Sequence, residues 1–282
     1  MKGEIVVIDT TPYGRVLVSD SLTHCDDRIN ARDVFCGGSF AGEEAVAIAL
    51  RQGVKAVIAH DGGIGKDQAG IGGLALAQRH GVPAAAVATM SARVSDARSL
   101  YDGVLSYVND AARGHGIAPG QAVHTAAWAL LKATPGRPIP VPPAAGDELR
   151  VLVPGSDGNI VAIWRSSLVT GQHPRDVFCL GSHLSDLVGR QVSAILPRGV
   201  IANDVGRAKD DSGIAGLPLL NGVGIPAATV GTLSARPGDA LSTYHDGVIS
   251  ACNALAGAAG VRVGMAAKEA AQKLLERTRV PT

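Results

Sequence analysis

The order of apolar and polar positions in the first half of the chain changes from one segment to the next. Residues 54–61 and 82–89 are almost continuously apolar, which is typical of short strands buried on both faces of a sheet. Residues 41–53 and 71–81 carry apolar side chains at helical spacing, and each segment ends at a glycine, a common helix stop. Strands and helices that alternate at short intervals predict a parallel sheet with right-handed crossovers.

Two further patterns, a hairpin and an amphipathic helix, occur in this half, and the helix pattern recurs at the end of the chain. Residues 4–11 and 15–21 flank a Pro-Tyr-Gly turn and predict a β-hairpin. Residues 121–133 have the spacing of an amphipathic helix, and residues 265–277 have the same spacing at the end of the chain. The predicted fold class is therefore α/β.

The second half of the chain repeats the first. The segment "ARDVFCGGS" from Ala31 matches "PRDVFCLGS" from Pro174, and "GVPAAAVATMSAR" from Gly81 matches "GIPAATVGTLSAR" from Gly224, both at a shift of 143 residues. After one inserted residue, His245, the shift becomes 144 residues. We predict two tandemly duplicated domains, each with a largely parallel sheet flanked by helices, that are related by a pseudo-two-fold axis.

A proline-rich stretch separates the two copies. The segment "TPGRPIPVPPAAGD" holds five prolines and no periodic apolar pattern, which is typical of a semi-rigid linker. The predicted division is a first repeat at 1–134, a linker at 135–146 and a second repeat at 147–282.

Composition and charge narrow the classes of partner. Aromatic residues make up 3% of the chain and the formal net charge is +1, so we expect neither base-stacking platforms nor a basic field, and no nucleic acid partner. The N-terminus reaches polar residues too soon for a secretory leader, and no apolar run approaches the roughly 18 residues of a membrane span. We expect a cytoplasmic protein with no membrane partner, a small-molecule substrate and four cysteines present as thiols. A homo-oligomer is left open.

A glycine-rich loop follows the first of the two buried strands in each copy. It reads "HDGGIGKDQAGI" from His60 and "NDVGRAKDDSGI" from Asn203. Glycines bring backbone N–H groups close to a ligand, and a lysine near a helix start adds positive charge, which together favour a carboxylate or phosphate site. The glycine spacing fits no nucleotide fingerprint, so no cofactor is predicted. The structural alternative is that Asp67 or its neighbour caps the following helix while Lys66 is solvated.

A Ser-Ala-Arg segment follows the second buried strand in each copy, as "MSARVSDARSLYDG" and "LSARPGDALSTYHDG". Arginine can hold a carboxylate or imide edge, and serine can act as a nucleophile if a lysine removes its proton. Because the carboxyl ends of parallel strands meet at one sheet edge, the spacing predicts one composite site per copy. The structural alternative is an Arg93–Asp96 ion pair that only holds the loop.

The leading hypothesis is an enzyme that hydrolyses an amide, linear or cyclic, in a small anionic or amide-containing metabolite. Serines would be nucleophiles or oxyanion donors, lysines their bases and two aspartates acid-base groups, while arginines and further aspartates hold the substrate. The predicted catalytic residues are Ser234, Lys209, Asp204, Ser91, Lys66 and Asp61. The predicted substrate-binding residues are Arg236, Arg93, Asp210, Asp67, Asp239 and Asp246. The second copy is the better candidate because its loops carry more ionisable groups.

Two other functions stay open. Cys36 and Cys179 occupy matched positions ahead of Gly-Ser and a predicted helix, whose N-terminus would lower a thiol pKa. By analogy with cofactor-independent racemases, each copy would supply one thiol to a two-base isomerase; the alternative is a buried, inert cysteine.

The remaining hypothesis is a non-catalytic small-ligand binding protein. His60 faces Asn203 in the alignment, and no histidine has metal-ligand spacing, so no metal is predicted.

Overall fold

The structure, a computed structural model, describes residues 3–142 and 148–276. Its contacts divide the chain into two compact units. Unit 1 consists of Met1–Ile64, Gln68–Pro143 and Arg207–Ser212, and unit 2 consists of Gly65–Asp67, Ala144–Gly206 and Gly213–Thr282. Each unit therefore includes a short segment from the other half of the sequence. Residues 143–147, which cover part of the predicted linker, and Arg277 in the last predicted helix lie outside the described residues.

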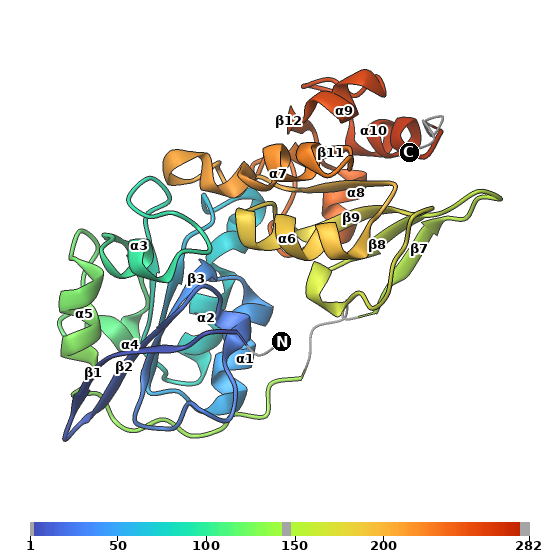
Figure 1. The fold of residues 1–282 in the computed structure, drawn as a ribbon. Coiled ribbons are helices and arrows are strands. Elements are labelled where there is room, and N and C mark those ends of the chain that lie inside the picture. Colours follow the sequence, from blue (N-terminus) through green and yellow to red (C-terminus); the bar gives the residue numbers. More distant parts are fainter. Residues whose placement is uncertain (1–2, 143–147, 277–282) are drawn as a thin grey trace. The chain divides into compact units, whose positions relative to one another are not determined.

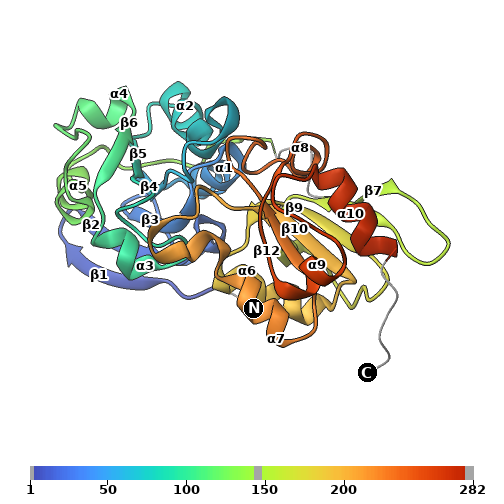
Figure 2. The same ribbon diagram turned by 90° about the horizontal axis from the view of Figure 1, so that it is seen from above.

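Unit 1 is built on a six-stranded sheet whose strands follow one another in chain order (Figures 1 and 2). The strands are β1 (Val6–Thr11), β2 (Gly14–Ser19), β3 (Val34–Phe40), β4 (Ala56–His60), β5 (Ala84–Val87) and β6 (Leu105–Val108). Strands β2 to β5 are parallel, whereas β1 and β6 pair antiparallel at the two edges. Because chain neighbours are also sheet neighbours, the parallel crossovers all advance in one direction.

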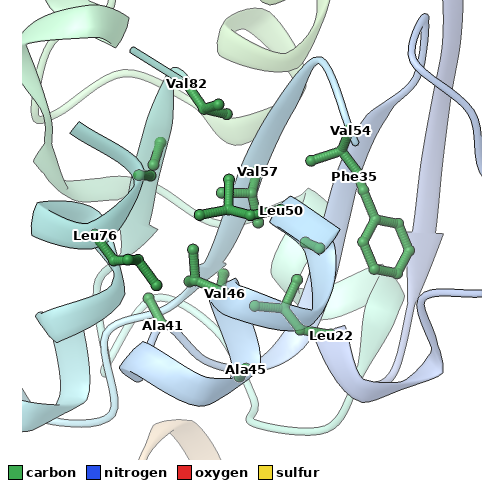
Figure 3. Packing of buried hydrophobic residues seen from close by; sticks show 14 of the residues in the cluster. Leu22, Phe35, Ala41, Ala45, Val46, Leu50, Val54, Val57, Leu76 and Val82 are labelled. Atoms are coloured by element: carbon green, nitrogen blue, oxygen red, sulfur yellow. The ribbon is translucent and has the colours of Figure 1, made fainter. Parts of the chain in front are cut away.

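Helices cover both faces of this sheet. They are α1 (Glu43–Gln52), α2 (Gly72–Arg79), α3 (Ala97–Tyr101), α4 (Asp110–Arg113) and α5 (Val123–Leu130), with short 3₁₀ segments η1 (Leu22–His24) and η2 (Lys66–Ile71). Side chains alternate along β3: Phe35 packs in the cluster with Val46 and Leu50 of α1 (Figure 3), and Cys36 packs in the opposite cluster with Leu100 and Leu130. Unit 1 thus has three layers, helices on either side of the sheet.

Unit 2 has the same strand order and the same directions. Its strands are β7 (Arg150–Val153), β8 (Ile160–Ile163), β9 (Val177–His183), β10 (Gly199–Asn203), β11 (Ala227–Val230) and β12 (Ile249–Cys252). Its helices are α6 (Asp186–Ile195), α7 (Gly216–Gly222), α8 (Ala240–His245), α9 (Ala254–Ala258) and α10 (Ala267–Glu276), with 3₁₀ segments η3 (Ser166–Leu168) and η4 (Lys209–Ile214). Figure 2 shows α6 and α7 on one side of the sheet and α10 on the other, where Phe178 and Cys179 pack respectively.

The α/β class is confirmed, with two six-stranded, mostly parallel sheets flanked by helices. The hairpin and the strands at 54–61 and 82–89 occur as β1–β2, β4 and β5. The position of Cys36 differs from the prediction, because β3 continues past it to Phe40 and no helix begins there. The described part of the predicted linker packs on unit 1, where Ile139 is buried and its N–H donates to Leu50 O at 3.0 Å. In the parts of the chain that are described, no helix is long and apolar enough to cross a membrane.

Candidate functional site

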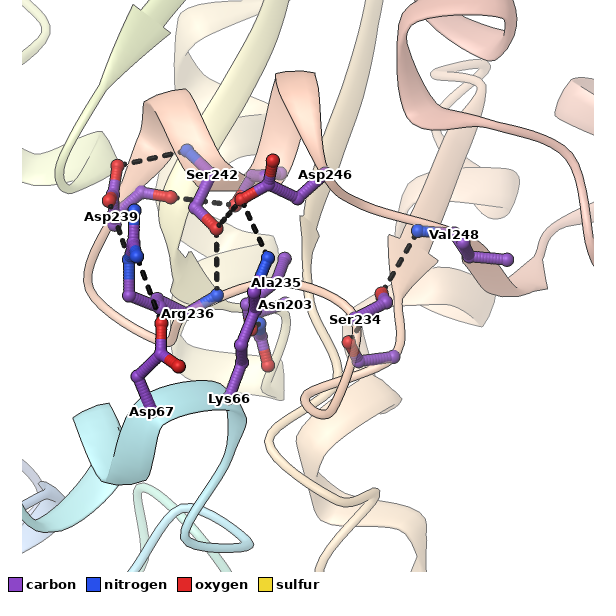
Figure 4. A network of polar contacts seen from close by, with 12 residues as sticks. Lys66, Asp67, Asn203, Ser234, Ala235, Arg236, Asp239, Ser242, Asp246 and Val248 are labelled. Carbon is purple, nitrogen blue, oxygen red and sulfur yellow. Dashed lines mark hydrogen bonds and ion pairs between the residues drawn. The ribbon is translucent and has the colours of Figure 1, made fainter.

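Charged side chains from distant parts of the sequence meet in unit 2, where the Gly65–Asp67 segment lies against the loop that follows β11 and against helix α8 (Figure 4). The backbone N–H of Lys66 donates to Thr232 O at 2.8 Å, and Lys66 Nζ lies 3.0 Å from Asp246 Oδ2. Arg236 Nη1 donates to Asp67 Oδ2 at 2.9 Å. One backbone hydrogen bond and two ion pairs therefore hold the Gly65–Asp67 segment in this unit.

Further contacts join these pairs into one network, which we call the unit 2 network: Lys66, Asp67, Arg236, Asp239, Ser242 and Asp246. Arg236 Nε donates to Asp239 Oδ2 at 3.2 Å, and Asp239 Oδ1 caps α8 by accepting from Ser242 N at 2.9 Å. Ser242 Oγ donates to Asp246 Oδ2 at 2.7 Å. This hydrogen bond, together with Lys66, lowers the pKa of Asp246, so its carboxylate stays ionised at neutral pH. Three hydrogen-bond donors, Lys66, Ser242 and Arg236, therefore alternate with three aspartate acceptors through the network.

The matched residues in unit 1 form a less complete arrangement. Lys209 N donates to Thr89 O at 3.1 Å, and Arg93 Nη1 donates to Asp210 Oδ2 at 3.2 Å. No ion pair joins Lys209 to Asp102 among the described residues, although their counterparts Lys66 and Asp246 are paired. Inserted His245 shifts the second acid by one position, since Asp246 follows Ser242 by four residues and Asp102 follows Ser99 by three.

These pairings differ from the expected composite sites. The sequence predicted Lys66 with Arg93 in one copy and Lys209 with Arg236 in the other. The structure instead places Lys66 with Arg236 in unit 2 and Lys209 with Arg93 in unit 1. Because both copies carry both motifs, the sequence contains no signal for which lysine loop joins which arginine loop.

The two predicted nucleophiles have a common structural environment. Ser234 Oγ donates to Gly231 O at 2.7 Å and accepts from Val248 N at 2.9 Å (Figure 4). Ser91 Oγ makes the matching bonds, at 2.9 Å to Ala88 O and 3.0 Å from Val104 N. Each serine hydroxyl thus donates its hydrogen bond to a backbone carbonyl three residues earlier. In the described structure, no lysine ammonium forms a hydrogen bond with either serine. The geometry favours a turn-forming role for both.

Of the two structural alternatives, the Asp67 helix cap is absent, whereas the local arginine–aspartate ion pair is present. Helix α2 begins after Ile71 without a side-chain cap, so Asp67 does not cap it. The local arginine–aspartate pairs are present, with Arg93 Nε 3.6 Å from Asp96 Oδ2 and Arg236 Nε 3.2 Å from Asp239 Oδ2. Both arginines use a second nitrogen for the aspartate of the glycine-rich loop, so the local pair is only part of their role.

The glycine-rich loops have an unusual backbone. Residues Gly62, Gly63, Ile64 and Gly65 have φ angles of 60°, 71°, 62° and 72°, and the matched Val205, Gly206, Arg207 and Ala208 have 43°, 71°, 65° and 58°. Each non-glycine residue in this left-handed region costs roughly 1–2 kcal/mol. Backbone strain of this kind clusters at functional sites, because the surrounding structure must stabilise it. The same strained path in both loops marks them as candidates for function.

His60 and Asn203 are chemically different but make equivalent hydrogen bonds. His60 Nδ1 accepts from Gly62 N at 3.0 Å and Nε2 lies 3.1 Å from Ala92 O, whereas Asn203 Oδ1 accepts from Val205 N at 2.8 Å and Nδ2 donates to Ala235 O at 3.0 Å. Both side chains are fully buried. His60 therefore holds its loop to the next one as a neutral ring with the proton on Nε2, and burial lowers its pKa.

We predict that His60→Asn costs about 1 kcal/mol of unfolding free energy, whereas His60→Leu costs about 2–4 kcal/mol because it leaves two buried backbone groups without partners. We also expect His60→Asn to change how the free energy of unfolding depends on pH. A lowered His pKa in the folded state gives stability that is complete above the unfolded value of about 6.5 and is lost as pH falls below it. Urea unfolding from pH 7 to 5 should show a smaller acid-side loss for His60→Asn, with the His24 contribution retained because burial also lowers the His24 pKa. An unchanged pH slope would contradict the neutral ring.

Cys36 and Cys179 do not have the environment of catalytic thiols. Both are fully buried in strands, and burial raises the pKa of each thiol to about 12. The sequence predicted a lowered pKa at a helix N-terminus, but each cysteine lies within a strand and packs among apolar side chains. The structure therefore gives the two-thiol isomerase no support.

Comparison with protein-family models, curated proteins and solved structures finds no match for this chain. Within the described residues, no group of three or more His, Cys, Asp or Glu side chains could hold a metal ion. The case for function therefore depends on the residues of the chain itself.

Proposed function

We propose that this chain is an enzyme that hydrolyses an amide bond in a small metabolite and that the unit 2 network binds the substrate. The observation that carries the proposal is the alternation of hydrogen-bond donors and acceptors in the unit 2 network, whose Arg236 and Asp239 follow β11. The carboxyl ends of parallel strands are common ligand sites. An amide presents both an N–H group and a carbonyl, and it can therefore bond to an aspartate and to Arg236 or Lys66 at once.

The charges of the network favour an amide over a simple anion. Two cationic residues, Lys66 and Arg236, lie among three aspartates, so a substrate with negative charge alone would meet an excess of carboxylates. The side chains of the Arg236–Asp67 pair are 42% and 60% exposed. Exposed ion pairs stabilise a fold by only about 0–1 kcal/mol, so a substrate can replace one partner at little cost.

We also propose that the two units arose by tandem duplication. The identical strand order supports this, as do the equivalent hydrogen bonds of His60 and Asn203 and of Ser91 and Ser234. Duplication explains why both loops keep a costly left-handed backbone.

A non-catalytic small-ligand binding protein is the second candidate. The observation that favours it is the engagement of Ser234 Oγ by two backbone groups, which leaves the network without the predicted nucleophile. In the hydrolase proposal, a water molecule replaces that serine as the attacking group.

The test is a panel of succinimide, hydantoin and N-acetylglycine, with succinate as the size-matched carboxylate. Proton NMR follows hydrolysis, and calorimetry follows binding. We expect turnover of at least one amide and weaker binding of succinate. Arg236→Gln should raise KM about tenfold or more, because it removes charge-assisted hydrogen bonds.

Arg190→Gln is the matched control, since Arg190 also pairs with an aspartate but lies on α6, outside the network. It should keep the wild-type kinetics. Binding of an amide without turnover would select the binding protein instead. Neither binding nor turnover across the panel, or equal effects of the two arginine variants, would reject the network as the substrate site.

A further inference from the structure

The two buried aspartates of the glycine-rich loops differ in how many hydrogen bonds they accept. Asp61 Oδ1 accepts from Gly63 N at 3.0 Å and from the Thr89 hydroxyl, and Asp61 Oδ2 accepts from Ser106 Oγ at 2.8 Å. Both oxygens of this carboxylate, which is 4% exposed, are therefore engaged. Asp61 is well placed to hold its loop and poorly placed to accept a proton.

Asp204 has one engaged oxygen. Its Oδ1 accepts from Gly206 N at 2.9 Å and from Thr232 N at 2.9 Å. Its Oδ2 accepts no hydrogen bond from the residues that the structure describes, although the side chain is buried with 5% exposure. Asp204 Oδ2 is not among the fully buried atoms that lack a partner, so this oxygen keeps some accessible surface and is a natural acceptor for a ligand or a water molecule.

The difference between Asp61 Oδ2 and Asp204 Oδ2 follows from one substitution between the copies, Ala86 in unit 1 and Thr229 in unit 2. Ser250 on β12 is the counterpart of Ser106 on β6, and each serine Oγ lies 3.3 Å from the matched carbonyl, Thr229 O or Ala86 O. In unit 2 the neighbouring side chain is the fully buried Thr229, whose Oγ1 lies 3.1 Å from Ser250 Oγ. In unit 1 that position is Ala86, which has no hydroxyl, and Ser106 bonds to Asp61 instead.

We propose that Asp204 is the general base of the reaction and that Thr229 keeps Asp204 Oδ2 available by holding the Ser250 hydroxyl. The proposal rests on the amide hydrolysis proposed above. Asp204 Oδ2 takes a proton from a water molecule as the water oxygen forms a bond to the amide carbon. The same proton then passes to the nitrogen as the C–N bond breaks, which leaves a carboxylic acid and an amine. Asp61 is a positioning residue for its loop.

The first test compares kinetics with a panel amide that the wild type hydrolyses. Asp204→Asn should lower kcat about 100-fold or more with little change in KM, because general bases contribute at least this much. Asp61→Asn should lower the urea midpoint and retain more turnover than Asp204→Asn. Thr229→Val should lower kcat, since Ser250 Oγ can then donate to Asp204, and Thr229→Val/Ser250→Ala should restore it. Equal losses of kcat in the two aspartate variants, or no rescue in the double variant, would overturn the proposal.

The second test needs no substrate. A water-soluble carbodiimide with glycine ethyl ester labels accessible carboxyl groups, and peptide mass spectrometry quantifies each site. Asp204 should label several-fold faster than Asp61, and Thr229→Val should slow it. Equal labelling of the two, including none at either, would overturn the assignment of Asp204. If Asp204 labels faster but the wild type hydrolyses no amide, the proposed function fails while the difference between the carboxylates stands.

Discussion

Gly65→Ala is expected to lower the free energy of unfolding by about 2–5 kcal/mol. Gly65 has φ +72°, where an alanine costs roughly 1–2 kcal/mol. An added Cβ would lie 2.6 Å from Pro237 Cδ and 2.9 Å from Thr232 Oγ1, and overpacking of this kind costs about 1–3 kcal/mol. Urea denaturation followed by circular dichroism measures the change. The substituted residue belongs to the segment that carries Lys66, so we also expect the variant to weaken amide binding.

Ala208→Gly is the matched control, because Ala208 occupies the same position in the other loop with φ 58°. Glycine removes the left-handed strain but makes the unfolded chain more flexible, and these effects nearly cancel. Its unfolding free energy should stay within about 1 kcal/mol of the wild type. If Gly65→Ala were as stable as Ala208→Gly, the left-handed path of the first loop would be wrong.

Cys36 and Cys179 are expected to resist iodoacetamide in the native protein at pH 8. Their pKa of about 12, compared with an ordinary value of 9.0, lowers the thiolate fraction about a thousand-fold, and their side chains have no solvent exposure. Half-buried Cys252 is the internal comparison and should label first. In urea, Cys36 and Cys179 should label as Cys252 does. Mass spectrometry of the peptides distinguishes the sites.

Native labelling of Cys36 or Cys179 at the rate of Cys252, together with loss of turnover, would favour the two-thiol isomerase over the hydrolase. Labelling that appears only in urea would leave the cysteines as members of the two apolar cores.

Local patterns in the sequence were sufficient for several elements of the fold. The runs at 54–61 and 82–89 form β4 and β5 because β-branched and small apolar residues suit strands that are buried on both faces. Helix α1 ends at Gly53, which has φ +83°, as the glycine stop predicted. The extension of β3 past Cys36 was missed, because its Gly-Gly-Ser sequence is typical of a turn. Pairing with β4 outweighs that preference.

Less of the candidate site could be predicted. The motifs identified the charged residues, but which residues pair depends on where the loops lie in the fold. Asp67 and Asp210 are chemically identical candidates for pairing with Arg236, and only the structure shows that Asp67 is the partner. The left-handed backbone at Val205 contradicts the ordinary preference of a β-branched residue. The sequence did contain a signal for the contrast between Asp61 and Asp204, because Ala86 in one copy matches Thr229 in the other. The effect of this difference on Asp204 becomes clear only from the contact between Thr229 and Ser250 in the structure.

The division of the chain into units also bears on how the protein is made. Residues 207–212 belong to unit 1, although the rest of that unit lies before residue 144. A ribosome that has released strands β1 to β6 has not yet synthesised Ser212, whose hydroxyl accepts from Val94 N at 3.0 Å, or Asp210, the partner of Arg93. During synthesis the arginine loop of unit 1 therefore lacks these two contacts, which form only after about half of the second repeat has emerged.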